Sequence, residues 1–450
     1  MFFRQVLYRD LGCASYVLGD DGVAMVVDPR WDIEVYLEMA REENLRITDV
    51  LDTHDHADHV SGRERLGAAT GARVHRPSLD GAQERVFVLG QLRVSTAPAP
   101  GHRPEHRVLA VSDLSRSPEP WLLLTGDSLL VGDIARPDLA YEARDGARAL
   151  HGTLTRLLAV GDQVEVWPGH VGGSLCGGAG LSGKTSSTIG FERHNNPLLN
   201  MAEDRFVTEL TRSLPTRPPN VDRIVSLNRR TAAESAVTLE PLGAPDLTAL
   251  LSDGATVLDS RSPEAFDAAH LAGSVNLPLA SAGVGTRAGW TLSPEDPLVL
   301  VAADVGAAHR TAAALQAVGF SRLTGFSPAC ERTWAAAGLP VARADAWDLD
   351  RLAAALRADA VDLIDVREPG EWVLGHVAGS VNVPLHRLRD VASVVLPDRG
   401  RTTAVACAAG ARAAFAASLL RRSGRRRVVR ISGGGAPDLG TRGIELEVGL

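Results

Sequence analysis

The sequence predicts an α/β protein built from three consecutive domains. Its 450 residues correspond to about two to four domains of ordinary size. Short apolar runs alternate with stretches of helical composition, a pattern typical of α/β architecture. Two strings in the second half of the chain recur at one constant interval, which indicates two copies of a small domain.

Composition places the chain among ordinary globular proteins, with 45% hydrophobic and 23% charged residues. The net charge is −8 and no basic face stands out, which argues against nucleic acid and anionic membranes as partners. The arginine-rich run 421–427 is expected to be the C-terminus of a helix, where cations face the helix dipole.

The cysteine pattern and the N-terminus favour a cytoplasmic location. The four cysteines are far apart and show no C-x-x-C spacing, so neither a disulfide framework nor a zinc knuckle is indicated: Cys13, Cys176, Cys330 and Cys407. The first residues lack the pattern of a signal peptide. No apolar run approaches the roughly 18 residues that a membrane span needs.

Residues 1–242 form the first predicted domain. Residues 22–27 predict a strand that is closed by a proline turn, and residues 32–43 predict a helix with an aspartate near its start. Residues 172–183 are rich in glycine and are expected to be a loop. A proline-rich surface turn at 215–220 lies near the end of the domain.

The segment 53–62 concentrates potential metal ligands. Three imidazoles and two carboxylates lie within six residues: His54, Asp55, His56, Asp58 and His59. An apolar strand end precedes them and a helical stretch follows, so the cluster occupies a strand-to-helix loop where side chains can converge. Imidazole and carboxylate together suit a divalent transition metal. The alternative is a polar loop of solvated histidines.

Three later strands also end in a potential ligand. His102 follows the strand at 92–96, Asp127 follows the apolar run at 122–124, and His170 follows a run that starts at Val164. Each ligand comes directly after a strand, so all of them are expected at one end of a sheet.

The order H-x-H-x-D-H, His, Asp, His resembles the metallo-β-lactamase superfamily, which implies an αββα sandwich. The strings T-H-x-H-A-D-H-x-S-G and A-P-G-H, and T-G-D-S-L-L followed by Ala135–Asp138, look most like persulfide dioxygenases. That resemblance implies one non-haem Fe(II) per chain, held by His54, His102 and Asp127. Two imidazoles and one carboxylate leave three positions open for a persulfide sulfur and O₂.

The same resemblance implies supporting roles for further residues. His56, Asp58, His59 and His170 match positions that bind a second metal in superfamily hydrolases. In the dioxygenases they are expected to orient ligands and water. Arg136 matches an arginine near the substrate pocket, and we expect it to bind a carboxylate or phosphate of the thiol.

Two cysteines of the first domain have open roles. The loop 172–183 is longer than in enzymes that use glutathione, so the chain is more similar to fusion enzymes that accept other low-molecular-weight persulfides. Cys176 in this loop is either a sulfur relay or gate near the iron, or a loop cysteine without a role. Cys13, beside the N-terminal strand, is expected to have a packing role.

The second half contains the repeat. Residues 259–266 recur as 365–372, and residues 270–279 recur as 376–385, each 106 positions later. One copy spans 243–343 and the other spans 344–450. Apolar strands alternate with helical stretches in both copies, which predicts small α/β domains with parallel sheets.

Both copies resemble rhodanese domains, through D-x-R-x-P and H-x-x-G-S-x-N-x-P-L. The resemblance implies a three-layer α/β fold and sulfur transfer in a six-residue loop, here Cys407–Arg412 after the strand at 402–406. Backbone N–H groups of this loop, including that of Gly410, and the following helix N-terminus favour an anion. With Arg412 they are expected to stabilise a Cys407 thiolate that carries sulfane sulfur. The alternative is a buried, inert cysteine.

The first copy lacks this nucleophile. After the strand at 298–302 the aligned position is Ala303, or Asp304 with a one-residue shift. Cys330 lies outside the loop and is expected to be structural. We therefore expect residues 243–343 to be catalytically silent and to act as a spacer, a docking surface or an oligomer contact.

The whole chain resembles bacterial persulfide dioxygenase–rhodanese fusions. The resemblance implies oxidation of a thiol persulfide by O₂ to sulfite in sulfide detoxification. Cys407 would interconvert persulfide plus sulfite with thiosulfate. By analogy we expect a homo-oligomer. Two alternatives stay open: a dinuclear thioester hydrolase similar to glyoxalase II, and a non-catalytic sulfur carrier or sensor.

Overall fold

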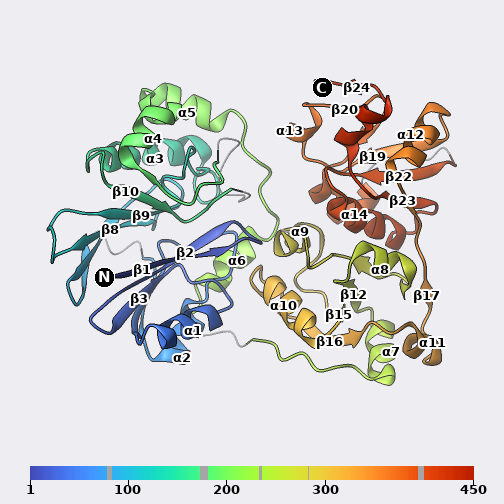
Figure 1. The fold of residues 1–450 in the computed structure, drawn as a ribbon, viewed down its shortest axis with the longest axis horizontal. Coiled ribbons are helices and arrows are strands. Elements are labelled where there is room, and N and C mark those ends of the chain that lie inside the picture. The colour runs from blue at the N-terminus through green and yellow to red at the C-terminus, as the bar shows by residue number, and fades with distance from the viewer. Residues whose placement is uncertain (79–83, 173–180, 233–235, 282, 394–399, 450) are drawn as a thin grey trace. The chain divides into compact units, whose positions relative to one another are not determined.

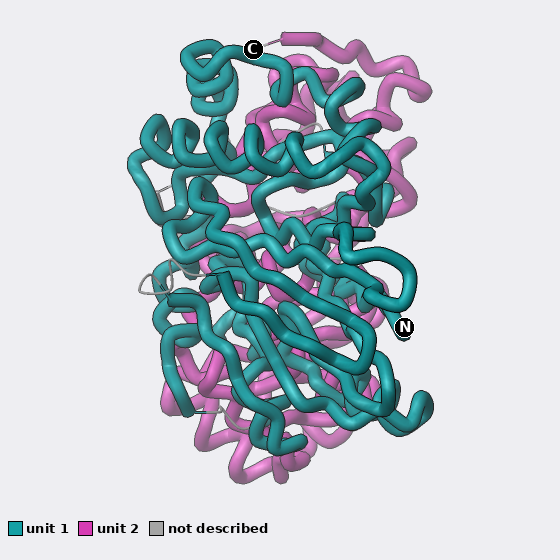
Figure 2. Tube along the Cα trace, turned by 90° about the vertical axis from the view of Figure 1, so that its left-hand side faces the viewer, with its two compact units in different colours: residues 1–236, 316–319 teal, residues 237–315, 320–450 magenta. Residues whose placement is uncertain are grey.

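The chain forms two compact units, which Figure 2 distinguishes by colour. The N-terminal unit holds Met1–Ala236 and Gln316–Gly319, and the C-terminal unit holds Val237–Leu315 and Phe320–Leu450. The computed structural model describes residues 1–78, 84–172, 181–232, 236–281, 283–393 and 400–449. The expected domain limits at 242 and 343 stay predictions, because this division does not test them.

A five-stranded sheet of order β1-β2-β3-β4-β5 forms one half of the N-terminal unit. Its strands are β1 (Phe2–Tyr8), β2 (Cys13–Asp20), β3 (Val23–Val27), β4 (Arg46–Leu51) and β5 (Arg73–His75). The first three strands pair antiparallel, whereas β3, β4 and β5 run parallel.

A six-stranded sheet of order β11-β10-β9-β8-β7-β6 forms the other half. Its strands are β6 (Arg85–Leu89), β7 (Leu92–Pro98), β8 (Arg107–Asp113), β9 (Leu122–Gly126), β10 (Glu165–Pro168) and β11 (Ser187–Thr188). Only the β9–β10 pair is parallel among these neighbours, so the carboxyl ends of β9 and β10 lie at the same edge.

Alternating residues of the strands build the layers, because successive side chains of a strand point to opposite faces. Tyr16 and Leu18 join Leu122 and Leu124 in the core between the two sheets. Val17, between the first two, belongs instead to the core under the helices.

Helices cover both outer faces of this pair of sheets (Figure 1), which confirms the predicted αββα sandwich. Tyr36 of α1 and Leu66 of α2 pack on the first sheet. Leu150 of α3 and Phe206 of α5 pack on the second. The helices are α1 (Glu34–Glu42), α2 (Arg63–Thr70), α3 (Ala143–Leu158), α4 (Ile189–Asn195), η1 (Pro197–Asn200), α5 (Glu203–Thr211) and α6 (Val221–Asn228).

The C-terminal unit contains two parallel sheets, one for each predicted copy. The first has the order β14-β12-β15-β16, with β12 (Thr256–Asp259), β14 (Val275–Asn276), β15 (Leu298–Ala302) and β16 (Leu323–Pro328). The second has the order β18-β23-β22-β19-β21, with β18 (Ala346–Trp347), β19 (Val361–Asp365), β21 (Val381–Asn382), β22 (Thr402–Ala406) and β23 (Val428–Ile431). Parallel sheets in this half were expected from the sequence.

Each copy adds a short antiparallel pair and several helices. The pairs are β13 (His270–Leu271) with β17 (Val341–Ala342), and β20 (His376–Val377) with β24 (Leu446–Glu447). The helices of the first copy are α7 (Ala244–Ser252), α8 (Pro263–Ala268), α9 (Val284–Thr291), α10 (Val305–Gln316) and α11 (Glu331–Ala336). Those of the second are α12 (Leu349–Arg357), α13 (Pro369–Trp372), η2 (Leu385–Ser393), α14 (Ala411–Arg422) and η3 (Ala436–Arg442).

Helix α14 is buried on every side. Eight consecutive residues, 413–420, are all buried, which a helix on a sheet surface does not show. The first copy covers part of it, because the backbone N–H of Asn276 in β14 donates to Ser418 Oγ at 2.9 Å. Arg430 of β23 also pairs with Asp267, at the end of α8, at 2.6 Å.

None of the helices in the described ranges combines the length and the hydrophobicity that crossing a bilayer requires.

Candidate active sites

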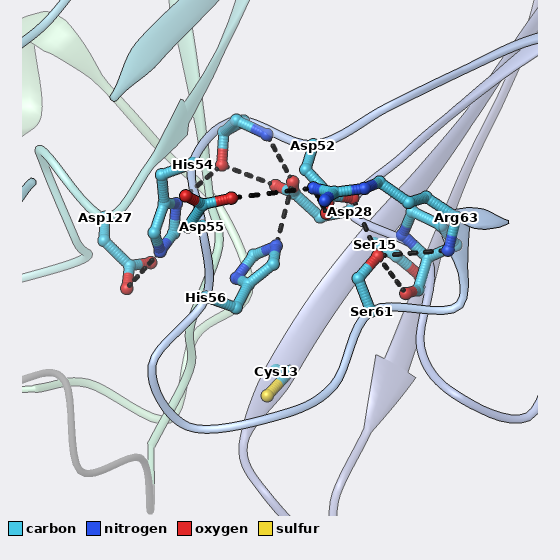
Figure 3. Close-up of polar contacts among 12 residues, drawn as sticks. Cys13, Ser15, Asp28, Asp52, His54, Asp55, His56, Ser61, Arg63 and Asp127 are labelled. Atoms are coloured by element: carbon cyan, nitrogen blue, oxygen red, sulfur yellow. Dashed lines mark hydrogen bonds and ion pairs between the residues drawn. The ribbon is translucent and has the colours of Figure 1, made fainter. Parts of the chain in front are cut away.

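Three buried side chains from three loops converge in the N-terminal unit. His54 follows β4, His102 follows β7, and Asp127 follows β9; all three are fully buried. Asp127 Oδ2 lies 3.7 Å from His54 Nε2 and 3.5 Å from His102 Nε2. Within the described part of the chain, none of these three atoms has a hydrogen-bond partner. Figure 3 shows Asp127 beside the His54 ring.

The opposite edges of the two imidazoles are held in place. His102 Nδ1 lies 2.9 Å from the Arg136 carbonyl oxygen, to which it donates. His54 Nδ1 lies 2.9 Å from Thr53 Oγ1, which in turn donates to Asp28. A proton on Nδ1 leaves a lone pair on Nε2, so both rings are oriented as metal ligands.

The pKa shifts of His54, His102 and Asp127 also suit metal binding. Burial, reinforced by the neighbouring imidazoles, holds the pKa of His54 well below its usual value, and burial also lowers the pKa of His102. Burial opposes ionisation of Asp127, but His170 outweighs it and lowers the Asp127 pKa. Two neutral imidazoles and a carboxylate with unpartnered donor atoms form a set that suits a divalent transition metal.

A second donor cluster adjoins the first. His170 Nδ1 lies 2.7 Å from Asp127 Oδ1, and His170 Nε2 lies 2.8 Å from Asp58 Oδ2. The other Asp58 oxygen lies 3.1 Å from His59 Nδ1. Burial disfavours the charged form of His59, but the Asp58 carboxylate outweighs it and holds the His59 pKa well above its usual value. His59 Nε2 and His56 Nδ1 lack partners among the described residues.

Beside the His54 ring, a carboxylate network fixes the 53–62 loop (Figure 3). Asp28 accepts from Thr53 N at 2.6 Å and lies 3.1 Å from His56 Nε2. Asp52 accepts from Ser61 Oγ at 2.9 Å and from Arg63 at 2.8 Å. The loop is therefore held by buried partners at several points rather than solvated, which is evidence against the polar-loop alternative.

The buried Arg136 guanidinium is engaged by the protein itself. Its Nε and Nη2 donate to Asp138 at 2.7 Å each, and other donors reach the carbonyl oxygens of Pro215 and Thr216. These contacts leave the guanidinium little capacity for the expected substrate carboxylate. The backbone of Arg136 instead orients His102.

The loop after β22 surrounds a buried cysteine. Cys407 is 2% exposed, and the Gly410 backbone N–H donates to its sulfur at 3.0 Å. Gly410 has φ +95°, a conformation that favours glycine. Helix α14 begins at the next residue, so its N-terminal N–H groups lie at the end of the loop.

Arg412 pairs with a carboxylate instead of contacting Cys407 Sγ directly. Its two terminal nitrogens lie 2.5 and 2.7 Å from the oxygens of Glu371. Part of the positive charge expected at Cys407 is therefore offset by Glu371.

The corresponding loop of the first copy is shorter. Two residues separate the end of β15 from Val305, where helix α10 begins, whereas four residues separate the end of β22 from Ala411, where α14 begins. Asp304 accepts from the Ala307 backbone N–H at 2.7 Å and so caps α10. Ala303 is the residue directly after the strand, in the place that Cys407 has in the second copy.

Comparison with known families agrees with this architecture. The metallo-β-lactamase superfamily model matches residues 8–117. The rhodanese-like domain model matches twice, at 243–326 and 348–436. The chain is a metallo-β-lactamase–rhodanese fusion protein.

Individual relatives cover different parts of this fusion protein. The human mitochondrial persulfide dioxygenase ETHE1 is 24% identical over 241 residues, which is 51% of this chain and 88% of the relative. The hydroxyacylglutathione hydrolase of Anaeromyxobacter dehalogenans is 31% identical over 165 residues, 35% of this chain and 60% of the relative. A crystal structure of a metallo-β-lactamase from Staphylococcus aureus covers 73% of this chain and 98% of its own, with 27% identity and a TM-score of 0.64.

Several residues that contribute to the two sites were not predicted from the sequence. Asp28 carried the same signal as the chosen ligands, a polar residue directly after a buried strand. Asn228, which donates to the carbonyl oxygens of His56 and His59, carried no such signal, and neither did Glu371, because each reaches its site from another segment of the chain. Gly435 packs on the Cys407 loop so closely that a Cβ there would lie 2.1 Å from the Cys407 carbonyl oxygen. Cys176 lies outside the described residues.

Proposed function

We propose that the N-terminal unit is a mononuclear Fe(II) persulfide dioxygenase and that Cys407 is the sulfur carrier of a linked sulfurtransferase. The first part rests on the convergence of one buried ligand atom each from His54, His102 and Asp127, none of which has a hydrogen-bond partner among the described residues. Similarity to persulfide dioxygenases and the two rhodanese-like domains both support a role in sulfur metabolism.

The proposed first reaction converts R–S–SH, O₂ and H₂O into R–SH, sulfite and two protons. A bound ferrous ion would supply the O₂ chemistry that side chains lack. The chain's own part is to hold and orient. His170 binds the second oxygen of Asp127, so that carboxylate presents Oδ2 alone to the ligand centre. Because all three side chains are fully buried, bulk water is kept away from their ligand atoms.

The proposed second reaction uses Cys407. Its thiolate attacks the outer sulfur of R–S–SH, and R–SH leaves as a Cys407 persulfide forms. Sulfite then takes that sulfur as thiosulfate, and the thiolate returns. The Gly410 N–H, at 3.0 Å from the sulfur, and the N-terminus of α14 stabilise the anion in both steps. Fusion keeps sulfite close to the group that consumes it.

A second candidate is a dinuclear thioester hydrolase. His56 Nδ1 and His59 Nε2, which lack partners in the described part of the chain, favour it, as does the similarity to hydroxyacylglutathione hydrolases. Two metals and a bridging hydroxide would then be needed.

Oxygen uptake and metal content separate the two candidates. Protein purified without air and loaded with Fe(II) is expected to contain about one iron per chain and to consume O₂ with glutathione persulfide or another thiol persulfide. Asp127→Asn is expected to lose most of the iron and at least tenfold of the uptake. Two metals per chain, no O₂ uptake and hydrolysis of a glutathione thioester would instead establish the hydrolase.

A further inference from the structure

A pocket lined by arginines lies at the amino end of β22 in the C-terminal unit. We call it the arginine pocket; its volume is about 410 Å³. Seven residues of only three types line it: Gly400, Arg401, Thr403, Gly424, Arg425, Arg426 and Arg427. Within the described part of the chain, no carboxylate and no aromatic or aliphatic side chain belongs to this lining. Neither the proposed metal site nor the Cys407 loop uses these residues.

The helix end that the sequence predicts for the run 421–427 explains only its first two arginines. Helix α14 ends at Arg422, and Arg421 donates to the Val428 carbonyl oxygen at 3.0 Å. The arginines at 425–427 lie beyond the helix, in the connection to β23. A helix dipole attracts cations within its last turn, so it does not account for these three.

Hydrogen bonds hold two of the arginines against the end of the sheet. Arg425 Nε donates to Thr403 Oγ1 at 3.0 Å, and Arg427 Nη1 donates to the Gly400 carbonyl oxygen at 2.7 Å. The backbone carbonyl oxygen of Arg427 also accepts from the Thr403 N–H at 2.8 Å. These side chains are partly ordered in advance, which lowers the entropy that is lost when a ligand binds.

The backbone of Arg427 is strained. Its φ is +55°, in the left-handed region where glycine and asparagine are the usual residues. An arginine in this conformation is unfavourable for the fold, and strained residues are concentrated at functional sites. The strain therefore suggests that the Arg427 side chain is needed where it lies.

The positive charge of the pocket is only partly neutralised. Arg401 donates from its two terminal nitrogens to Asp359 at 2.6 and 2.9 Å. This hydrogen bonding is the main reason why the pKa of Arg401 is raised, and the charge of Asp362 adds to it. Two carboxylates offset at most two of the four guanidinium charges. Arg426 is exposed and has no hydrogen bond or ion pair with any described residue.

Linked phosphate groups are the anions that this lining fits best. The planar guanidinium of arginine binds phosphate oxygens through paired N–H bonds and stays charged throughout the working pH range of proteins. A pocket of about 410 Å³ has the size of a small-molecule site, which leaves room for more than one phosphate. The lining offers no aromatic ring on which a nucleic-acid base could stack and no apolar surface for an acyl chain.

We propose that the arginine pocket binds a small anion with two or more linked phosphate groups. This site is additional to the proposed sulfur chemistry and does not depend on it. Thr403 lies near the amino end of β22, whereas Cys407 follows the carboxyl end of the same strand. The phosphate ligand and a sulfur substrate at Cys407 can therefore be bound at the same time.

Calorimetric titration of the full chain with tripolyphosphate at physiological salt tests the proposal. The double variant Arg426→Gln/Arg427→Gln removes two charges from the pocket. The control Arg310→Gln/Arg332→Gln removes two exposed arginines elsewhere in the same unit and changes the net charge equally. Wild type and control are expected to bind alike, and the pocket variant is expected to bind about tenfold more weakly or worse. Orthophosphate is expected to bind wild type more weakly than tripolyphosphate.

Every other outcome overturns the proposal. Wild type that does not bind tripolyphosphate has no such site, and equal binding by all three proteins would place the anion elsewhere. Equal affinity for orthophosphate and tripolyphosphate would remove the requirement for linked phosphates. A DNA duplex or phosphatidylglycerol vesicles that bind wild type when tripolyphosphate does not would identify a macromolecular surface instead.

A single variant serves if the double variant does not fold, as judged by circular dichroism. Arg426→Glu reverses one charge and breaks no bond to a described residue. It is expected to weaken tripolyphosphate binding about fivefold or more, whereas Arg332→Glu is expected to leave it unchanged. Equal affinities of these two variants would contradict the proposal.

Discussion

The ring nitrogens of two buried histidines determine what the N-terminal unit can bind. His54 and His102 each have one nitrogen fixed by the protein and the other left without a partner in the described structure. Leaving a buried polar atom unpaired costs about 1–3 kcal/mol, so three such atoms at one point imply a missing partner. A metal ion is the partner that these donors fit.

A second residue, His106, is expected to make the stability of the N-terminal unit depend on pH. Its Nε2 accepts from the Asp127 backbone N–H at 2.9 Å, which requires a neutral ring. Burial is the main cause, and together with the neighbouring His102 ring it lowers the pKa of His106 to about 4 from the usual 6.5. Between these values the unfolded chain binds a proton that the folded chain does not, so stability falls as the pH falls. The loss is about 2 kcal/mol at pH 5.

His106→Gln keeps an acceptor for the Asp127 N–H but does not titrate. We expect the metal-free variant to lose less stability than metal-free wild type between pH 7 and pH 5. Urea unfolding followed by tryptophan fluorescence measures the difference. An equal loss in both proteins would show that His106 does not carry this pH dependence.

At the scale of elements, α6 holds the 53–62 loop in place through one side chain. Asn228, its last residue, donates to the carbonyl oxygens of His56 and His59 at 2.9 Å each. Its Oδ1 accepts from the Ser61 N–H at 2.8 Å. The residue is buried, so water does not replace these bonds.

Asn228→Ala is expected to lower the melting temperature and to destabilise the N-terminal unit by about 2–4 kcal/mol, because it leaves three buried backbone groups unpaired. It should also weaken metal retention, since the loop carries His54. Asn195→Ala is the matched control, because that exposed side chain bonds only within its own helix. Calorimetry and zinc retention after dialysis check both effects, and equal behaviour of the two variants would contradict the role of Asn228.

Sequence reasoning located elements better than contacts between them. Strand 402–406, strand 298–302 and the helix after Gly62 were all expected where they occur, because apolar runs and their boundaries are local signals. The convergence of His54, His102 and Asp127 was expected from their positions after strands. The Asn228 and Glu371 contacts were not, because the chain folds back over long separations to make them. Arg136 pairs with Asp138 and Arg412 pairs with Glu371. Both carboxylates lie within the matched strings, but the strings do not reveal these pairings.

At the scale of the whole molecule, the two proposed activities are expected to separate by mutation. Cys407→Ser should leave O₂ uptake within twofold of wild type and release free sulfite, while enzymatic thiosulfate formation falls at least a hundredfold. The reason is that Cys407 lies in the C-terminal unit and the proposed metal ligands lie in the N-terminal unit. Sulfite and thiosulfate are measured by bimane derivatisation and chromatography.

Cys330→Ser is the control for this experiment, because it changes a cysteine outside the β22 loop. It is expected to behave as wild type in both assays. Thiosulfate formation that survives in Cys407→Ser would assign sulfur transfer to another residue.

The all-round burial of α14 bears on why a duplicate without a nucleophile persists. Part of that helix is covered by the first copy, and the same helix begins at the Cys407 loop. Deleting residues 243–343 would expose the alanine-rich surface of α14 to water. We expect this to loosen the loop that surrounds Cys407 Sγ. A copy that lacks a cysteine in this loop can therefore still support the fold of the copy that carries Cys407.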